Sequence, residues 1–297
     1  MNRRDSYMKR AKIISCLVVA SMVLGLTAGC GKTNKVTTEQ FEKACEKLGC
    51  DEFDAEDNPD ADDIEDGIYI IMDEDDIEDE EDQINESLGL IGLDDVVEAD
   101  DIKSFGVFTK GNGFSDIENI GYNGLDDIED LELDFAVALQ ATLKDDDKCE
   151  DIMDFVEDLL DDYDLDVDDL RADEYYRSKT EGYLRVNIDI ETLAKIALDN
   201  DDLMDLLDSL GSDSDEIVDL LESISGNVCI TLEVCGDSVI IVVGVGFNTE
   251  SETVSDFCKA VGIEDPSKLK TNEEFIEDIV DSLVKNIMKF MSLAYSF

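Results

Sequence analysis

The sequence predicts an α+β fold, in which antiparallel sheets made of hairpins pack against helices in two subdomains. Three observations support this class. Apolar residues alternate without interruption over 131–143, which is the period of a strand. Two further apolar runs, 228–235 and 238–247, are separated only by the turn Gly236-Asp237. Other segments, including 37–48, place apolar residues at helical spacing.

The first subdomain, residues 37–165, is expected to begin with a helix over 37–48. Thr37 and Gln40 have the spacing of a capping box, and Gly49 is typical of a helix end. The following elements are an acidic loop at 51–66, a strand at 67–72, a helix at 74–88, a strand at 102–109, the half-buried strand 131–143 and a helix at 147–160.

The second subdomain, residues 166–297, follows the acidic stretch 161–169. It is expected to contain a hairpin that turns near Glu181-Gly182, helices at 191–210 (broken near Asn200) and 214–224, the hairpin 228–247, and helices at 250–261 and 272–295. The two-residue turn pairs Val234 with Val239, Leu232 with Ile241 and Ile230 with Val243.

The sequence makes two further suggestions, one about the core face of the last helix and one about an internal duplication. The apolar spacing of the last helix predicts that Ile276, Ile279 and Leu283 face the core. Strand 131–143 with its helix and strand 238–247 with its helix share a layout, which permits a duplication but does not establish one, because the unit is common.

The first 30 residues have the composition of an export signal. A basic start is followed by an apolar run that ends at Gly29, short of the roughly 20 residues needed to span a membrane. Leu26-Thr27-Ala28-Gly29-Cys30 resembles the lipobox of bacterial lipoprotein precursors. The resemblance implies cleavage after Gly29 and acylation of Cys30, so that residues 1–29 are a signal peptide and 30–36 a lipidated tether. It also implies a location on the extracytoplasmic face of the cell membrane, with membrane lipid as a partner through Cys30.

Negative charge dominates the remaining chain. Residues 1–29 hold five of the 23 basic residues and one of the 78 acidic residues, which leaves a mature net charge of −59. Such a field repels nucleic acid and attracts cations and basic proteins. DNA or RNA binding is therefore excluded, and cations or basic proteins are the expected soluble partners.

The chain contains no histidine and no tryptophan. Histidine-dependent catalytic triads and His-ligated metal sites are therefore excluded, and we expect no enzymatic activity and no cofactor. A carboxylate-dependent hydrolase remains the less favoured alternative. Six cysteines remain after Cys30, and buried free thiols are expected for most of them: Cys45, Cys50, Cys149, Cys229, Cys235 and Cys258.

One acidic segment has the spacing of a calcium-binding loop. Its candidate ligands are Asp54, Glu56, Asp60, Asp62 and Glu65. Pro59 occupies the position where an EF-hand needs glycine, so weak calcium binding by solvated carboxylates is the expectation rather than a defined site.

A basic and aromatic cluster lies on the hairpin expected near residue 181. Arg177, Lys179, Arg185 and Tyr183 are its candidate ligand-binding residues. The alternative is that these cations compensate the chain's own carboxylates. The sequence thus predicts an anchored, acidic binding or structural module of the cell envelope, with capture of divalent cations or basic peptides as the alternative.

Overall fold

The computed structural model describes residues 33–53, 59, 61–90, 96–113, 128, 131–163, 165–210 and 214–294. The elements and contacts reported below belong to these residues.

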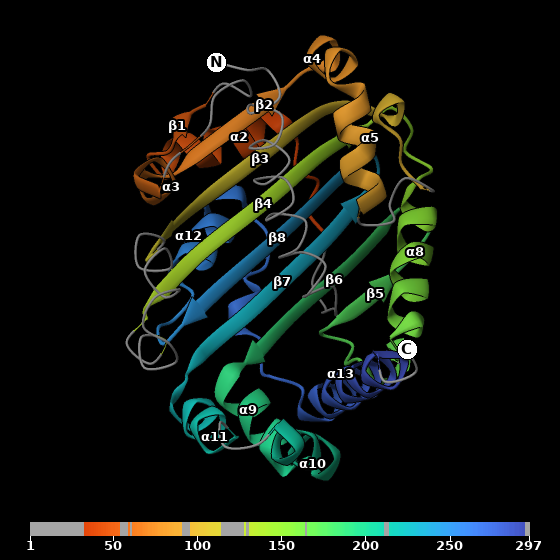
Figure 1. The fold of residues 1–297 in the computed structure, drawn as a ribbon. Helices are drawn as coiled ribbons and strands as arrows, with labels where there is room; N and C mark the ends of the chain where they lie inside the picture. Colours follow the sequence, from red (N-terminus) through yellow and green to blue (C-terminus); the bar gives the residue numbers. More distant parts are fainter. Residues whose placement is uncertain are drawn as a thin grey trace.

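One eight-stranded sheet organises the fold (Figure 1). Its order is β1-β2-β3-β4-β8-β7-β6-β5, and every neighbouring pair is antiparallel except β1 and β2. The strands are β1 (Asp51–Glu52), β2 (Ile68–Met72), β3 (Ile102–Asn112), β4 (Leu133–Leu143), β5 (Tyr175–Arg177), β6 (Glu181–Asp189), β7 (Gly226–Cys235) and β8 (Ser238–Phe247).

The α+β class is confirmed, and the sheet contains strands from both expected subdomains. Strand β4 pairs with β8 from Leu133 opposite Phe247 to Thr142 opposite Ser238. The hairpin of β7 and β8 has the predicted register, including Val234 opposite Val239 and Ile230 opposite Val243. Hydrogen bonding therefore continues across the boundary expected at residues 165/166.

Helices cover both faces of this sheet. They are α2 (Thr38–Lys47), α3 (Ala61–Asp66), α4 (Glu74–Asp79), α5 (Glu81–Leu90), α8 (Cys149–Asp162), α9 (Ile190–Asp199), α10 (Asp201–Leu210), α11 (Ser214–Ser223), α12 (Glu252–Val261) and α13 (Glu273–Ala294), with short 3-10 turns η2 (Ala99–Asp101), η3 (Val167–Asp169) and η4 (Pro266–Lys268). Figure 1 shows α2 and α12 behind the sheet and α5, α8 and α13 toward its right-hand side.

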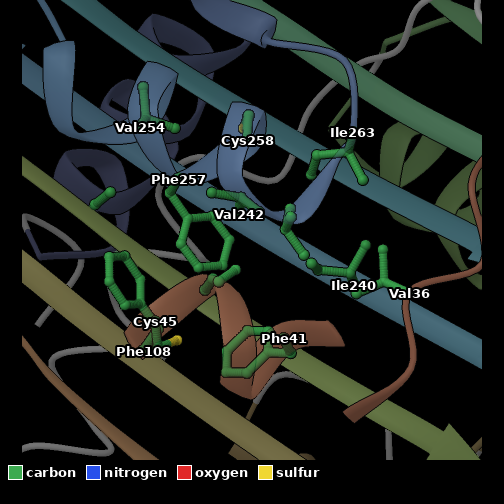
Figure 2. Close-up of a cluster of buried hydrophobic side chains, with 14 of the residues drawn as sticks. Val36, Phe41, Cys45, Phe108, Ile240, Val242, Val254, Phe257, Cys258 and Ile263 are labelled. Carbon is green, nitrogen blue, oxygen red and sulfur yellow. The ribbon is translucent and has the colours of Figure 1, made fainter. Parts of the chain in front are cut away.

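Three phenylalanines join α2 and α12 to the sheet. Phe257 of α12 stacks on Phe108 of β3 with ring centroids 4.3 Å apart, and it meets Phe41 of α2 edge-on at 5.6 Å. All three rings are fully buried, and Figure 2 shows them gathered with the aliphatic side chains of this face. Gly106 lies directly under Phe41, where a Cβ would come within 2.8 Å of the ring. We call this group the aromatic cluster.

Strand β4 is buried on both faces, which corrects the expectation of a half-buried strand. Leu133, Val137 and Leu143, which belong to the alternating apolar set, are buried, and Leu143 packs in the same apolar group as α8. The intervening residues Ala136 and Ala138 are also inaccessible to solvent, because they lie under the aromatic cluster. Small residues here let α2 and α12 approach the backbone closely.

The opposite face carries two further apolar groups. Helix α8 contributes residues from Cys149 to Leu160, and α4 contributes Ile77. The core face of α13 is made of Phe275, Ile276, Val280 and Val284, all at most 3% exposed. Leu283, which was expected to face inward, is 56% exposed, so this prediction was wrong. Apolar residues occupy more than one side of α13, so their spacing alone does not identify the side that is buried.

Several boundaries also differ from those expected. The helix predicted at 74–88 is interrupted at Glu80 into α4 and α5. The supposed loop 51–66 contains β1 and α3, which were missed because both are short and acidic. The chain turns before β6 at 178–180 rather than at Glu181-Gly182.

Helices α8 and α12 lie on opposite faces of the sheet. Strands β4 and β8 are antiparallel neighbours, and a two-fold rotation about the sheet normal would exchange them. That rotation would leave both following helices on one face. The observed arrangement therefore gives no support to a duplication of the strand–helix unit.

The segment before α2 is part of the folded body. Thr33 and Val36 are buried, although both fall in the expected tether. The carbonyl of Val36 accepts hydrogen bonds from Gln140 Nε2 at 3.1 Å and from Ser238 Oγ at 2.6 Å. The predicted capping box of α2 is present at Thr37 and Gln40. Within the described ranges, no helix combines the length and apolar character needed to cross a bilayer.

The aromatic cluster yields a direct prediction. Replacing Phe257→Ala should lower the free energy of unfolding by about 3–5 kcal/mol, because it removes a buried ring and leaves a cavity. Leu283→Ala is the matched control and should change that free energy by about 0.5 kcal/mol or less, since Leu283 is largely exposed. Urea unfolding followed by circular dichroism measures both. A similar loss in the two variants would contradict the assignment of the core.

Candidate functional site

The two candidate arginines of the hairpin β5–β6 point to opposite faces of the sheet. Arg177 faces α8, and Arg185 faces the side covered by α12. Ser178 holds the turn between them, since its hydroxyl accepts a hydrogen bond from the Glu181 amide at 3.1 Å. Lys179 is exposed in this turn.

Arg177 pairs with two carboxylates of α8. Its guanidinium contacts Asp154 and lies 2.8 Å from Glu157 Oε2, while the Tyr175 hydroxyl donates to Glu157. Burial lowers the pKa of Arg177, but the hydrogen bonds to Glu157 and Asp154 outweigh burial and raise it. Burial and the hydrogen bond to Glu157 raise the pKa of Tyr175.

Arg185 and Glu233 form an ion pair in the core. Each side chain is 1% exposed, and the Arg185 Nε and Nη2 atoms lie 3.0 and 2.5 Å from Glu233 Oε1. The Asn34 amide donates to the other carboxylate oxygen at 3.3 Å. The guanidinium lies 4.7 Å from the ring centre of Tyr183, which stacks on Tyr176. Cation–π attraction thus adds to the ion pair.

Burial raises the pKa of Glu233 above its ordinary 4.5, and Arg185 opposes that rise. The pair therefore depends on both partners, because removing Arg185 would leave a buried carboxylate without a counter-charge. Both candidate arginines are engaged by the chain's own carboxylates. Ligand binding by Arg177, Lys179, Arg185 and Tyr183 remains a prediction, with Lys179 the accessible cation among them.

The candidate calcium ligands are only partly described. Asp54, Glu56 and Asp60 lie outside the described residues, whereas Asp62 and Glu65 belong to α3. A different acidic group, Asp145-Asp146-Asp147, brings three exposed carboxylates within 4.8 Å of one another just before α8. Exposed acidic groups of this kind do not by themselves indicate a bound ion.

A shallow polar depression of about 520 Å³ lies at the ends of β6, β7 and β8. Several of its side chains already bond one another. Asn227 donates to Asn187 at 2.8 Å and accepts from the Ser251 hydroxyl at 2.8 Å, while Asp189 accepts from the Thr192 amide at the start of α9. No local sequence pattern indicates this depression, because its residues come from separate segments. These contacts hold the loop after β8 and the start of α9 in place.

The six cysteines after Cys30 are free in the structure, and all but Cys235 are buried, as expected. Burial raises the pKa of Cys149 to about 11 and also raises those of Cys45, Cys229 and Cys258. The thiolate form is therefore disfavoured at these positions in the folded chain.

The ion pair Arg185–Glu233 yields the second prediction. Arg185→Met should lower the free energy of unfolding by about 3–5 kcal/mol at pH 8, because it leaves Glu233 buried and unpaired. Burial raises the folded-state pKa of Glu233 and Arg185 opposes that rise, so in the variant this pKa is higher than in wild type. As pH falls, the folded variant therefore takes up this proton before the folded wild-type chain and before the unfolded chain. The loss relative to wild type should therefore be smaller at pH 5 than at pH 8.

Two further variants control this measurement. Arg177→Met, at the partly exposed pair, should cost about 1 kcal/mol and show no comparable recovery at pH 5. The double variant Arg185→Met/Glu233→Met should regain much of the lost stability, because no buried charge remains. Urea titrations at both pH values measure these differences. A loss in Arg185→Met that is the same at pH 5 and pH 8 would contradict the role given to Glu233.

No known protein-family model, curated protein or solved structure matches this chain.

Proposed function

We propose that the mature chain is a lipid-anchored module on the extracytoplasmic face of the cell membrane, where its acidic surface captures basic segments of other proteins. Cys30 is the attachment point, and the folded body is the binding part. One observation carries it: the mature chain has 77 acidic and 18 basic residues, and its three arginines are all engaged internally.

Support for the anchor comes from the lipobox-like residues before Cys30 and from the start of the folded body. Thr33, three residues after Cys30, is buried. Three residues span at most about 11 Å, so acylation at Cys30 would hold the body close to the lipid surface. Two or three acyl chains are needed for stable attachment, and lipoprotein processing supplies them.

Support for capture comes from the distribution of ion pairs. Lys35, Lys144 and Lys148 contact Asp237, Glu74 and Asp101, respectively. The arginines likewise contact acids of the same chain. These six cations are thus used within the fold, and the excess carboxylates generate a field that attracts positive partners.

A basic peptide fits this surface better than a tightly bound divalent ion. Calcium prefers six to eight oxygen ligands converging on one point. Apart from the three at Asp145-Asp146-Asp147, exposed carboxylates are spread over separate elements, as in Asp62 of α3, Asp75 of α4 and Asp158 of α8. An extended chain with several lysines can contact such dispersed charges at once.

The third prediction tests both parts of the proposal, beginning with the anchor. The wild-type precursor should remain with bacterial membranes after a high-salt wash, and Cys30→Ala should release the chain from them. Intact mass should show a diacylated or triacylated mature form that begins at Cys30. A mature form that keeps residues 1–29, or that carries an unmodified Cys30 thiol, would contradict the anchor.

The binding arm uses the purified mature chain and a fluorescent lysine-rich peptide. Affinity should fall several-fold as the ionic strength rises from about 0.01 to 0.15 M, because the screening length shortens from about 30 to about 8 Å. An acidic peptide of equal length is the control and should not bind. Equal affinity at low and high salt would contradict capture by the surface field.

Two triple variants distinguish binding by the overall negative charge from binding at one local site. The first changes Asp145, Asp146 and Asp147 to Asn, and the second changes Glu150→Gln, Asp151→Asn and Asp158→Asn on the exposed side of α8. Each removes three charges, so both should weaken peptide binding by a similar factor. A loss confined to the first variant would instead indicate a defined site at that cluster.

A further inference from the structure

Helix α2 ends in a Schellman motif whose two key positions are cysteines. The amide of Cys50 donates to the carbonyl of Cys45 at 3.1 Å, and the amide of Gly49 donates to the carbonyl of Glu46 at 3.0 Å. Gly49 has the left-handed conformation that this motif requires, with φ of +74°. In such a motif the residues that share the outer hydrogen bond also bring their side chains into contact.

This hydrogen bond limits how far apart the two cysteine backbones can lie. The direct Cα-to-oxygen distance within Cys45, the 3.1 Å hydrogen bond and the N–Cα bond of Cys50 together allow a Cα–Cα distance of at most about 7 Å. Disulfide-bonded cysteines usually have Cα atoms about 4.4–6.8 Å apart. Cys45 and Cys50 also belong to the same buried apolar cluster, beneath α2 and beside the aromatic cluster.

The two thiols differ in their surroundings. Cys45 is fully buried, whereas Cys50 keeps 8% of its surface accessible. The Lys110 side chain passes beside Cys50, because a Cβ built on Gly67 would lie 2.8 Å from the Cys50 sulfur and 2.9 Å from Lys110 Cδ. Lys110 also donates to the Asp66 carbonyl at 2.8 Å, which fixes its position. Burial raises the pKa of both thiols, but Lys110 opposes the rise at Cys50, where 8% of the surface stays accessible. Cys50 is therefore the better nucleophile of the two.

We propose that Cys45 and Cys50 form a disulfide bond that links the last turn of α2 to the start of β1. The oxidant is a disulfide-bonded thiol compound or a protein dithiol oxidant. The Cys50 thiolate attacks one sulfur of that disulfide and releases one thiolate. The Cys45 thiolate then attacks the Cys50 sulfur and releases the second. Two cysteine thiols lose two protons and two electrons, and the oxidant is reduced to two thiols.

The bond forms while the chain folds, before α2 and the sheet exclude solvent from Cys45. The backbone motif is local, so it can bring the two sulfurs together at that stage. Cys229 and Cys258 serve as a comparison for the pair Cys45–Cys50. Both are fully buried in the same cluster, but no local backbone motif joins them. They lie on β7 and α12, and Cys229 directs its thiol to the Gly244 carbonyl at 3.6 Å.

The experiment is refolding of the mature chain, with Cys30→Ser to remove that thiol, in a mixture of reduced and oxidised glutathione. Free thiols are then alkylated, and the chain is digested with trypsin without reduction. Lys47 lies between the two cysteines, so peptides 44–47 and 48–103 stay joined only if the bond is present. We expect most of Cys45 to be in this joined product, with Cys229 and Cys258 alkylated.

A pair of glycine variants tests the role of the motif. Gly49→Ala should lower the joined fraction, because alanine opposes the left-handed conformation at the helix end. Gly236→Ala is the matched control: its φ is +60°, and a Cβ there also meets open space, but it lies in the β7–β8 turn. It should leave the joined fraction unchanged. Folded wild-type chain without the joined peptides, or with links spread over several cysteine pairs, would overturn the proposal.

Discussion

The fold depends on keeping a large negative charge away from one continuous apolar sheet. Strands β3 and β8 contain no acidic residue, and β4 and β7 contain one each, Asp134 and Glu233. Both of these have partners: Asp134 accepts hydrogen bonds from Thr253 at the start of α12, and Glu233 pairs with Arg185. Most other carboxylates lie on helices and loops. Apolar burial in the sheet must therefore offset repulsion among the surface charges.

This separation explains which parts of the fold could be predicted from the sequence. The β7–β8 register followed from the two-residue turn between two apolar runs, which is a local feature. The pairing of β4 with β8 joins residues about a hundred positions apart, and no local pattern specifies it. Burial of the second face of β4 was not predicted, because alanines such as Ala136 and Ala138 occur on both buried and exposed faces. They are buried here because α2 and α12 cover them.

For the candidate site, the sequence indicated which residue types gather on the hairpin but not which way they point or what they contact. Arginines and tyrosines of the β5–β6 hairpin could be recognised, but their directions depend on where the turn falls. Glu233, the partner of Arg185, lies 48 positions away on β7. The cysteine pair did have a local signal, since Gly49 marks a helix end with Cys45 and Cys50 at the positions that meet in a Schellman motif. The proposed capture of basic segments rests on composition, and the structure adds that the arginines already pair with carboxylates of the same chain.

The opposition between surface repulsion and sheet burial can be measured directly. Urea unfolding of the mature chain at pH 8 should be followed at increasing NaCl concentration, since urea adds no charge of its own. Screening shortens the reach of the repulsion, so the free energy of unfolding should rise steeply at low salt and level off as the screening length nears about 3 Å at 1 M. A free energy of unfolding that stays constant or falls with added NaCl would contradict this picture of the fold.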